Sequence, residues 1–249
     1  LSDRRMAHAK DGQFWIENPH RALSNNSVAY TEKPDMTAFM EEWMTLMKSG
    51  SGERGIVNRV ALKESAKKSG RDPNYDFGVN PCGEIILRPR QFCNLTEVVV
   101  RPGDTYQDFI TKIEHATILG VLQSTLTEFN FLSEEWSKNV EEERLLGVSL
   151  TGLKDHPILS KTSEEAERWL KGGRWHAKAV AEFWAHTLDI PVPKAVTTVK
   201  PSGTVSQLVN SSSGMHPRHS EYYIRRVRVA TTDFRSSTLL DGRWGTLES

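Results

Sequence analysis

The sequence is poor in cysteine, with only Cys82 and Cys93 among 249 residues. Two cysteines are too few for a disulfide scaffold, and a chain of this length can bury a core without one. A zinc site is weakly supported, because there is no Cys-x-x-Cys pair and the histidine nearest in sequence is His115. A cysteine-protease pair would need a histidine partner that no motif marks. We therefore expect a reducing, cytoplasmic setting.

An excess of one charge is also missing, since 32 Lys and Arg residues balance 32 Asp and Glu residues. No overall field favours nucleic acid or an anionic membrane, so we expect neither as a partner. No apolar run approaches the length of a membrane span, and the N-terminal Leu1-Ser-Asp-Arg-Arg lacks the apolar core of a signal peptide. The missing initiator methionine suggests a segment of a longer chain. The sequence carries no signal for an oligomeric state.

Helices and strands are expected to alternate along the chain. Asp35 and Gly50 bound one predicted helix, Asp104 caps a second that runs to about Phe129, and Ser163 opens a third. Short strands are predicted at 27–30, 55–59, 84–87, 97–100, 144–152 and 195–199. This alternation, with short Gly/Ser loops, predicts an α/β layer or barrel. No linker divides the chain, so we expect one domain over residues 1–249.

Several large apolar side chains are predicted to lie in the core. Those of the first long helix recur at three-to-four spacing and form one stripe: Met36, Phe39, Met40, Trp43, Met44 and Met47. The tryptophans Trp169, Trp175 and Trp184 are assigned to the core as well. Gly172-Gly173 is expected to weaken the helix that carries these tryptophans.

The stretch from Asn80 to Asn94 holds both cysteines and is the most informative part of the chain. Cys82 lies in a Pro-Cys-Gly turn between an amide, Asn80, and a carboxylate, Glu84. Short strands are expected on both sides of a turn at Pro89. The two cysteines are therefore predicted to face each other across a hairpin-like finger.

Asn80-Pro-Cys-Gly-Glu-Ile, with Cys93-Asn-Leu eleven positions after Cys82, resembles the finger loop of the adenosylcobalamin-dependent, class II ribonucleotide reductases. Three further segments resemble the same family in the same order: Gly52-Glu-Arg-Gly-Ile-Val-Asn-Arg, Glu143-Arg-Leu-Leu-Gly-Val-Ser-Leu-Thr-Gly and Val199-Lys-Pro-Ser-Gly-Thr-Val-Ser. The segments Pro-Ser-Gly-Thr and Glu-Glu-Glu-Arg-Leu-Leu-Gly most resemble those of the monomeric ribonucleoside-triphosphate reductases. The resemblance implies part of a ten-stranded α/β barrel with a central cysteine finger.

The resemblance also implies a role for each residue of the finger. The family reduces ribonucleoside di- or triphosphates to 2'-deoxyribonucleotides for DNA synthesis, using a cysteine thiyl radical generated with adenosylcobalamin. Cys82 matches the thiyl position, Glu84 the carboxylate that takes the 3'-hydroxyl proton, and Asn80 the amide that orients the hydroxyls. Cys93 matches one of two reducing thiols that become a disulfide, which a thioredoxin-like protein or another dithiol then reduces.

The family's second reducing thiol and its C-terminal cysteine pair have no counterpart in this sequence. The resemblance therefore implies an incomplete barrel segment that lacks the N-terminal half of the barrel and the C-terminal cysteine tail, and that is inactive alone. Two hypotheses stay open. The chain is either the catalytic segment of a reductase or a non-catalytic remnant that keeps the fold and nucleotide binding.

Lys200-Pro-Ser-Gly-Thr-Val-Ser follows a predicted strand and matches the family's phosphate-binding loop. Its substrate-binding candidates are Ser202, Gly203, Thr204 and Ser206, and the loop is not a Walker A motif because the Gly-Lys-Ser/Thr end is missing. Asn26 and Ser27 precede a strand, where they either line the substrate pocket or form a capped turn. Arg225, Arg226 and Arg228 either contact phosphates or cobalamin side chains, or form a solvated strand face. No motif marks a cobalamin site or a metal site.

Overall fold

Helices and short strands alternate in the computed structural model, which describes residues 4–49 and 55–223. The helical elements are α1 (Arg4–Ala7), α2 (Phe14–Glu17), η1 (Pro19–Leu23), α3 (Met36–Ser49), α4 (Arg59–Lys68), α5 (Tyr106–Gln123), α6 (Glu134–Glu143), η2 (Leu153–Asp155), α7 (Glu164–Thr187) and α8 (Thr204–Leu208). The strands are β1 (Ser27–Tyr30), β2 (Gly55–Asn58), β3 (Gly78–Val79), β4 (Ile86–Leu87), β5 (Asn94–Val99) and β6 (Leu146–Thr151). The mixture of helices and strands agrees with the expected α/β class.

The six strands form three two-stranded sheets. β1 and β2 pair in parallel with α3 between them, and β5 and β6 pair in parallel with α5 and α6 between them. β3 and β4 form an antiparallel hairpin. The strand predicted at 195–199 is reduced to a parallel bridge between Val148 and Thr197, with backbone hydrogen bonds on either side. These described residues do not close a barrel, so the ten-stranded barrel stays a prediction.

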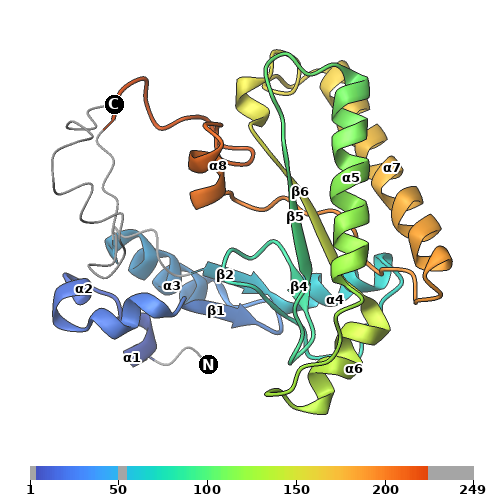
Figure 1. Ribbon diagram of the computed structural model, residues 1–249. Coiled ribbons are helices and arrows are strands. Elements are labelled where there is room, and N and C mark those ends of the chain that lie inside the picture. The colour runs from blue at the N-terminus through green and yellow to red at the C-terminus, as the bar shows by residue number, and fades with distance from the viewer. Residues whose placement is uncertain (1–3, 50–54, 224–249) are drawn as a thin grey trace, which may run out of the picture.

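The main core lies between the β5–β6 sheet and the two long helices α5 and α7, which stand side by side against it (Figure 1). β6 is a nearly fully buried strand, as its apolar sequence predicts. Gly172 and Gly173 do not interrupt α7. They let it approach α5 closely, because a Cβ atom at Gly173 would lie 2.6 Å from the Cδ1 atom of Ile113.

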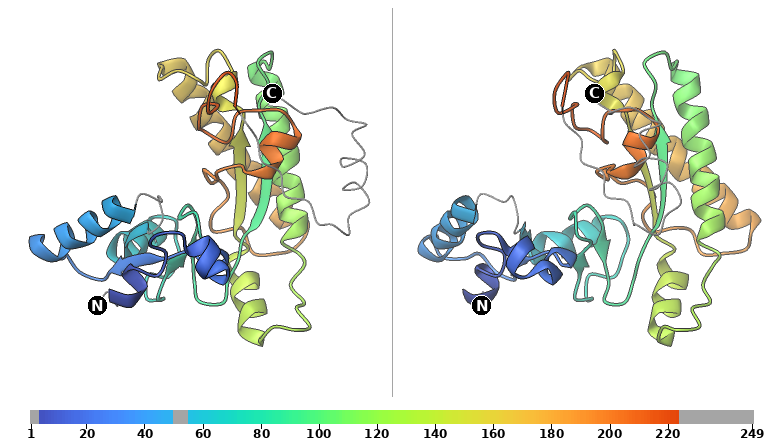
Figure 2. Two further views of the ribbon diagram at one scale, coloured as in Figure 1. Left: turned by 90° about the vertical axis from the view of Figure 1, so that its left-hand side faces the viewer. Right: turned by 60° about the vertical axis from the view of Figure 1, so that its left-hand side comes forward.

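α1, α2, α3 and the β1–β2 sheet extend away from one end of the β5–β6 sheet, and α8 lies on the side of this sheet opposite α5 (Figure 2). The prediction that the apolar stripe of α3 is core was wrong. Five of its six side chains are exposed, namely Met36, Met40, Trp43, Met44 and Met47, because the described part of the chain covers them only in part. Trp169 is buried as predicted, but Trp175 faces outward on α7 and is exposed.

Helix ends follow local side-chain chemistry. Ser163 caps α7 by accepting a hydrogen bond from the amide of Ala166, as predicted. The residue that caps α5 is Thr105 rather than Asp104, because Thr105 and Asp108 form a reciprocal capping box. α5 ends at Gln123, earlier than predicted. Among the described residues, no helix combines the length and apolar character needed to cross a membrane.

Candidate active site

Cys82 lies at the turn of the β3–β4 hairpin, which we call the finger. Gly83 adopts a φ of 81°, a conformation that suits glycine, and its amide donates to the Asn80 carbonyl at 2.9 Å. The prediction that the cysteines face each other across this hairpin was wrong. β4 pairs with β3, and Cys93 lies beyond the finger, immediately before β5. Neither cysteine is in a disulfide; Cys82 is exposed and Cys93 is half-buried.

The carboxylate of Glu84 lies at the centre of the polar contacts around the finger. Its Oε1 atom accepts a hydrogen bond from Asn80 Nδ2 at 2.6 Å and forms an ion pair with Lys200 Nζ at 3.1 Å. Asn80 is fixed in turn, because its Oδ1 atom accepts from the amide of Ile85 at 3.0 Å. The Oε2 atom of Glu84 is buried and has no hydrogen-bond partner among the described residues. It is therefore left as a buried acceptor.

Cys93 belongs to the same cluster, because the charges of Glu84 and Lys200 both act on its thiol. Burial raises the pKa of Cys93 from 9.0 to about 11, the negative charge of Glu84 raises it as well, and the positive charge of Lys200 partly offsets them. The thiol is thus protonated near neutral pH. The structure therefore joins Asn80 and Glu84 directly, and the charge of Glu84 acts on the half-buried Cys93 thiol.

Distant parts of the chain hold the finger in place. Arg71 donates to the Ile86 carbonyl at 2.8 Å, the Asn25 side-chain amide donates to the Pro81 carbonyl at 3.0 Å, and Thr198 donates to the Glu84 carbonyl at 3.3 Å. Arg71 is itself fixed by a buried cluster that contains Glu143, Arg88 and Gln91. Isolated hairpins this short are not stable, so these contacts determine where Cys82 lies.

Sequence reasoning missed the residues that make these contacts. Lys200 was part of the quoted phosphate loop, but nothing in the sequence indicated that it would reach a carboxylate 116 positions away. Arg71 carried no motif. Glu143, at the start of the Glu-Arg-Leu-Leu-Gly segment, gave the one available signal, since a carboxylate beside a buried strand requires a cationic partner.

The proposed phosphate loop runs from Pro201 into α8. The hydroxyls of Ser202 and Ser206 are buried and bonded internally: Ser202 accepts from the Ser206 amide at 3.0 Å, and Ser206 donates to the Ser202 and Gly203 carbonyls at 2.9 Å. Gly203 and Thr204 are exposed, and the space beside the Gly203 Cα atom is open. The two serines therefore shape this loop, and Gly203 and Thr204 are the members accessible to a ligand.

Asn26 and Ser27 lie at the start of β1. The Asn26 side chain donates to the Met6 carbonyl at 3.3 Å, and the Asn26 carbonyl accepts from the Gly55 amide at 2.9 Å. The contact between Asn25 and Pro81 brings this segment beside the finger turn. Arg225, Arg226, Arg228 and residues 52–54 of the first motif lie outside the described residues.

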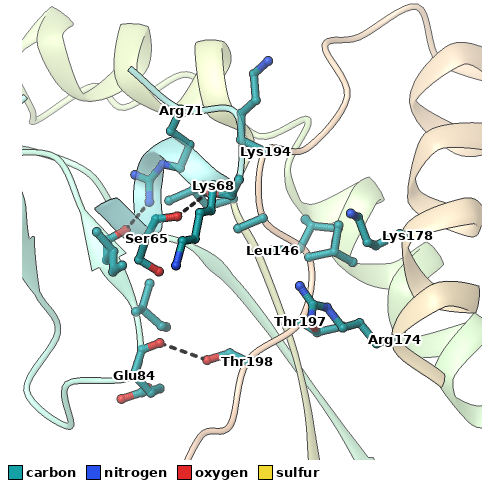
Figure 3. A pocket seen from close by; sticks show the side chains of 16 residues that line it. Ser65, Lys68, Arg71, Glu84, Leu146, Arg174, Lys178, Lys194, Thr197 and Thr198 are labelled. Atoms are coloured by element: carbon teal, nitrogen blue, oxygen red, sulfur yellow. Dashed lines mark hydrogen bonds between the residues drawn. The ribbon is translucent and has the colours of Figure 1, made fainter. Parts of the chain in front are cut away.

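A cavity of about 460 Å³ opens beside the base of the finger, and Glu84 and Thr198 lie at its edge (Figure 3). Five basic side chains line it. One is Arg71, which is paired with Glu143, and the other four are Lys68, Arg174, Lys178 and Lys194. No ion pair joins any of the four to another described residue. The cavity thus combines positive charge with a partly satisfied carboxylate, which suits a ligand that carries phosphate and hydroxyl groups.

Curated relatives align with most of this chain. Adenosylcobalamin-dependent ribonucleoside-triphosphate reductases from Levilactobacillus brevis and Lactobacillus helveticus are 30% and 29% identical, each over 86% of this chain and 32% of the relative. A protein of the same name from Euglena gracilis is 28% identical over 93% of this chain and 31% of its own length. The chain therefore spans about a third of the length of the curated relatives it matches. No protein-family profile matches the chain.

The fold comparison agrees with the sequence comparison. The crystal structure of a B12-dependent, class II ribonucleotide reductase superposes with a TM-score of 0.53 at 22% identity, covering 86% of this chain and 33% of the other. At this identity the match supports the fold alone. Together the comparisons confirm the resemblance that the motifs predicted, over a segment of the longer proteins.

Proposed function

We propose that this chain carries the cysteine finger of an adenosylcobalamin-dependent ribonucleotide reductase, which converts ribonucleoside triphosphates to 2'-deoxyribonucleotides. One observation carries the proposal: Cys82 is held at a turn whose two flanking polar side chains, Asn80 and Glu84, bond each other at 2.6 Å. Cys93, the proposed reductant, shares the electrostatic site of Glu84. The triphosphate form of the substrate follows from the names of the relatives.

The surroundings of each residue in the finger suit one step of ribonucleotide reduction. The Cys82 sulfur, as a thiyl radical, takes the hydrogen atom from C3' of the ribose. The free, buried Oε2 atom of Glu84 then accepts the 3'-hydroxyl proton, while Asn80 keeps the carboxylate oriented. The 2'-hydroxyl leaves as water with a proton from one of the two reducing thiols. Cys82 later returns the hydrogen atom to C3', which regenerates the thiyl radical. Because burial keeps the Cys93 thiol protonated, it can deliver a hydrogen atom rather than act as a thiolate.

The electron balance requires a second thiol. Replacing a 2'-hydroxyl by hydrogen consumes two electrons, and two thiols supply them by becoming one disulfide. With Cys82 assigned to the radical, Cys93 is the one other cysteine in the 249 residues. The second reducing thiol must therefore come from another polypeptide segment or from a dithiol, and a thioredoxin-like protein or dithiol must then restore the pair.

Adenosylcobalamin, when bound, supplies the radical that reaches Cys82. The residues present fit this use, because Cys82 is exposed, unbridged and at the tip of a turn. Cys82 is the residue that would face the cofactor, and no other described side chain marks where the corrin ring would lie. We place the substrate phosphates at the exposed backbone of Gly203 and Thr204, with the basic cavity beside Glu84 as a second source of positive charge.

We also propose that further polypeptide completes a ten-stranded barrel, and that the protein is cytoplasmic and makes DNA precursors. The alternative is a non-catalytic remnant that binds nucleotides but does not turn over. The exposed cysteine and the ordered carboxylate of the finger favour the catalytic hypothesis, because a remnant has no need to retain them together.

The test is to incubate the chain with a ribonucleoside triphosphate, adenosylcobalamin and a dithiol, and to measure deoxyribonucleotide and Co–C bond cleavage. The same assay is run on the chain extended at both ends. We expect product from the extended protein and none after Cys82→Ser. Ser133→Ala is the control, because Ser133 is exposed, lies outside the cavity and leaves both cysteines in place. Activity that survives Cys82→Ser would refute the radical assignment. An inactive extended protein that still binds nucleotide would support the remnant.

A further inference from the structure

Lys200 joins two regions that sequence reasoning treated separately, the finger and the proposed phosphate loop. We propose that Lys200 is a positioning residue that fixes the Glu84 carboxylate and couples it to the loop from Thr198 to Thr204. A catalytic role for Lys200 rests on the function proposed above, whereas the contact between Lys200 and Glu84 is a property of the folded chain. The ion pair between Lys200 Nζ and Glu84 Oε1 at 3.1 Å is the contact that carries it.

The two oxygens of Glu84 have different surroundings. Oε1 receives both Asn80 and Lys200, whereas Oε2 is buried and receives no hydrogen bond from the described residues. The Glu84 side chain is only 9% exposed, so the ion pair is poorly screened by solvent. Lys200 therefore holds one oxygen in place and leaves the other as the atom that can accept a proton.

Two side-chain hydrogen bonds join this loop to the finger, and Lys200 makes one of them. The Thr198 hydroxyl, two residues earlier, donates to the Glu84 carbonyl at 3.3 Å. Pro201 follows Lys200 directly, and its ring restricts the backbone between Lys200 and the buried Ser202. A ligand that binds at Gly203 and Thr204 therefore acts on a stiff segment whose other end holds the carboxylate.

Lys200 also balances charge beside the Cys93 thiol. The charged groups that act on this thiol are Glu84 from the finger and Lys200 from the loop. With Lys200 removed, the carboxylate would act on the thiol unopposed and the pKa of Cys93 would rise further. With Glu84 neutralised, the pKa would fall. Opposite shifts from the two substitutions are expected only if both charges lie beside the thiol.

The decisive experiment measures the alkylation rate of Cys93 in this chain at about pH 8, well below the midpoint of its thiol, where the rate follows the thiolate fraction. Cys82→Ser removes the other thiol. Lys200→Met should slow alkylation, Glu84→Gln should speed it, and Lys200→Arg should stay near the parent. Lys161→Met is the matched control, because Lys161 is an exposed lysine outside the site. Circular dichroism verifies that each variant is folded. An unchanged alkylation rate in Lys200→Met, or an equal change in Lys161→Met, would overturn the proposal.

A second readout uses the extended protein described under Proposed function. If Lys200 positions Glu84, Lys200→Met should lower kcat by about 10- to 100-fold with little change in KM, because a charged hydrogen bond to the reacting group is lost. Lys200→Arg should recover part of this loss. A raised KM at unchanged kcat would show instead that Lys200 only binds phosphate, and would overturn the positioning role. Absence of turnover in the parent protein would count against the proposed function alone, since the alkylation assay needs no turnover.

Discussion

Arg71 and Glu143 lie 72 positions apart in sequence and form a two-point ion pair in the protein interior. Arg71 Nε lies 3.0 Å from Glu143 Oε1, and Arg71 Nη2 lies 2.7 Å from Oε2. Arg88 adds a second cation at 3.1 Å, and Gln91 donates to Oε2 at 2.7 Å. Burial alone would raise the pKa of Glu143, but the bonds from Arg71 and Gln91 and the charges of Arg71 and Arg88 outweigh it and lower the pKa.

Replacing this carboxylate should be strongly destabilising. Glu143→Gln leaves Arg71 buried without its counter-charge, which costs about 3–5 kcal/mol in the free energy of unfolding. Glu135→Gln is the matched control, because its ion pair with Arg90 is exposed and contributes less than about 1 kcal/mol. Urea denaturation of both variants measures the difference. Equal small losses would show that the buried pair does not stabilise the fold.

The same ion pair predicts how stability depends on pH. Because the pKa of Glu143 in the folded state lies below its ordinary value of 4.5, its contribution is fully present above pH 4.5 and is lost as the pH falls through the folded value. Glu143→Gln should therefore flatten the acid limb of the stability curve. Thermal melting between neutral pH and pH 3 tests this, and an identical acid limb in both proteins would contradict it.

Gly172 and Gly173 should respond differently to alanine. A Cβ at Gly173 would lie 2.6 Å from Ile113 Cδ1 and 2.8 Å from Phe109 Cε1, and both of these side chains are buried. Gly173→Ala should therefore destabilise the protein by about 1–3 kcal/mol despite the better helix propensity of alanine. At Gly172 the nearest atom is the hydroxyl of the partly exposed Tyr106, which can move. Gly172→Ala should be near neutral, and equal losses at both positions would refute this account.

Two tryptophans on α7 provide a second matched pair. Trp169 is 8% exposed and packs on Tyr106, Phe109 and His156, whereas Trp175 is 71% exposed. Trp169→Ala should lower the free energy of unfolding by about 3–5 kcal/mol. Trp175→Ala should change it by no more than about 0.5 kcal/mol. Chemical denaturation followed by circular dichroism compares them, and a large loss at Trp175 would reveal packing that the described residues lack.

The cysteines should differ in their reactivity with an alkylating reagent. Cys82 is exposed, whereas burial raises the pKa of Cys93 to about 11. At pH 8 iodoacetamide should modify Cys82 first, and modification of Cys93 should accelerate as the pH approaches 11. Peptide mass spectrometry over time resolves the two sites. Faster modification of Cys93 at pH 8 would contradict the burial of its thiol.

The parts of the fold that sequence predicted are those fixed by local chemistry. Ser163 caps α7, and the apolar run of β6 becomes a buried strand, because neighbouring residues determine both. The stripe of α3 was assigned to the wrong environment for a physical reason. Helical spacing shows that Met40 and Met44 share a face, but it does not show whether anything packs on that face.

In the candidate site, too, sequence predicted the local residues and missed their distant partners. Asn80, Cys82 and Glu84 could be named from sequence because they lie within one turn. The partners that orient them, Lys200 and Arg71, come from distant segments. A lysine or arginine in sequence gives no indication of which carboxylate it will meet.

Thr105 displaced Asp104 as the cap of α5 because a reciprocal pair with Asp108 satisfies more backbone groups than one side chain can.

The finger hairpin has only two residues in each strand, and its geometry depends on Asn25, Arg71 and Thr198. A synthetic peptide covering residues 78–95 would contain both cysteines and every residue of the motif, yet it would not hold the Cys82 sulfur in a defined position. Grafting this loop onto another scaffold would fail for the same reason unless the three anchors were transferred with it. The unit that an engineer would have to move is therefore spread over more than 170 positions of sequence, from Asn25 to Thr198.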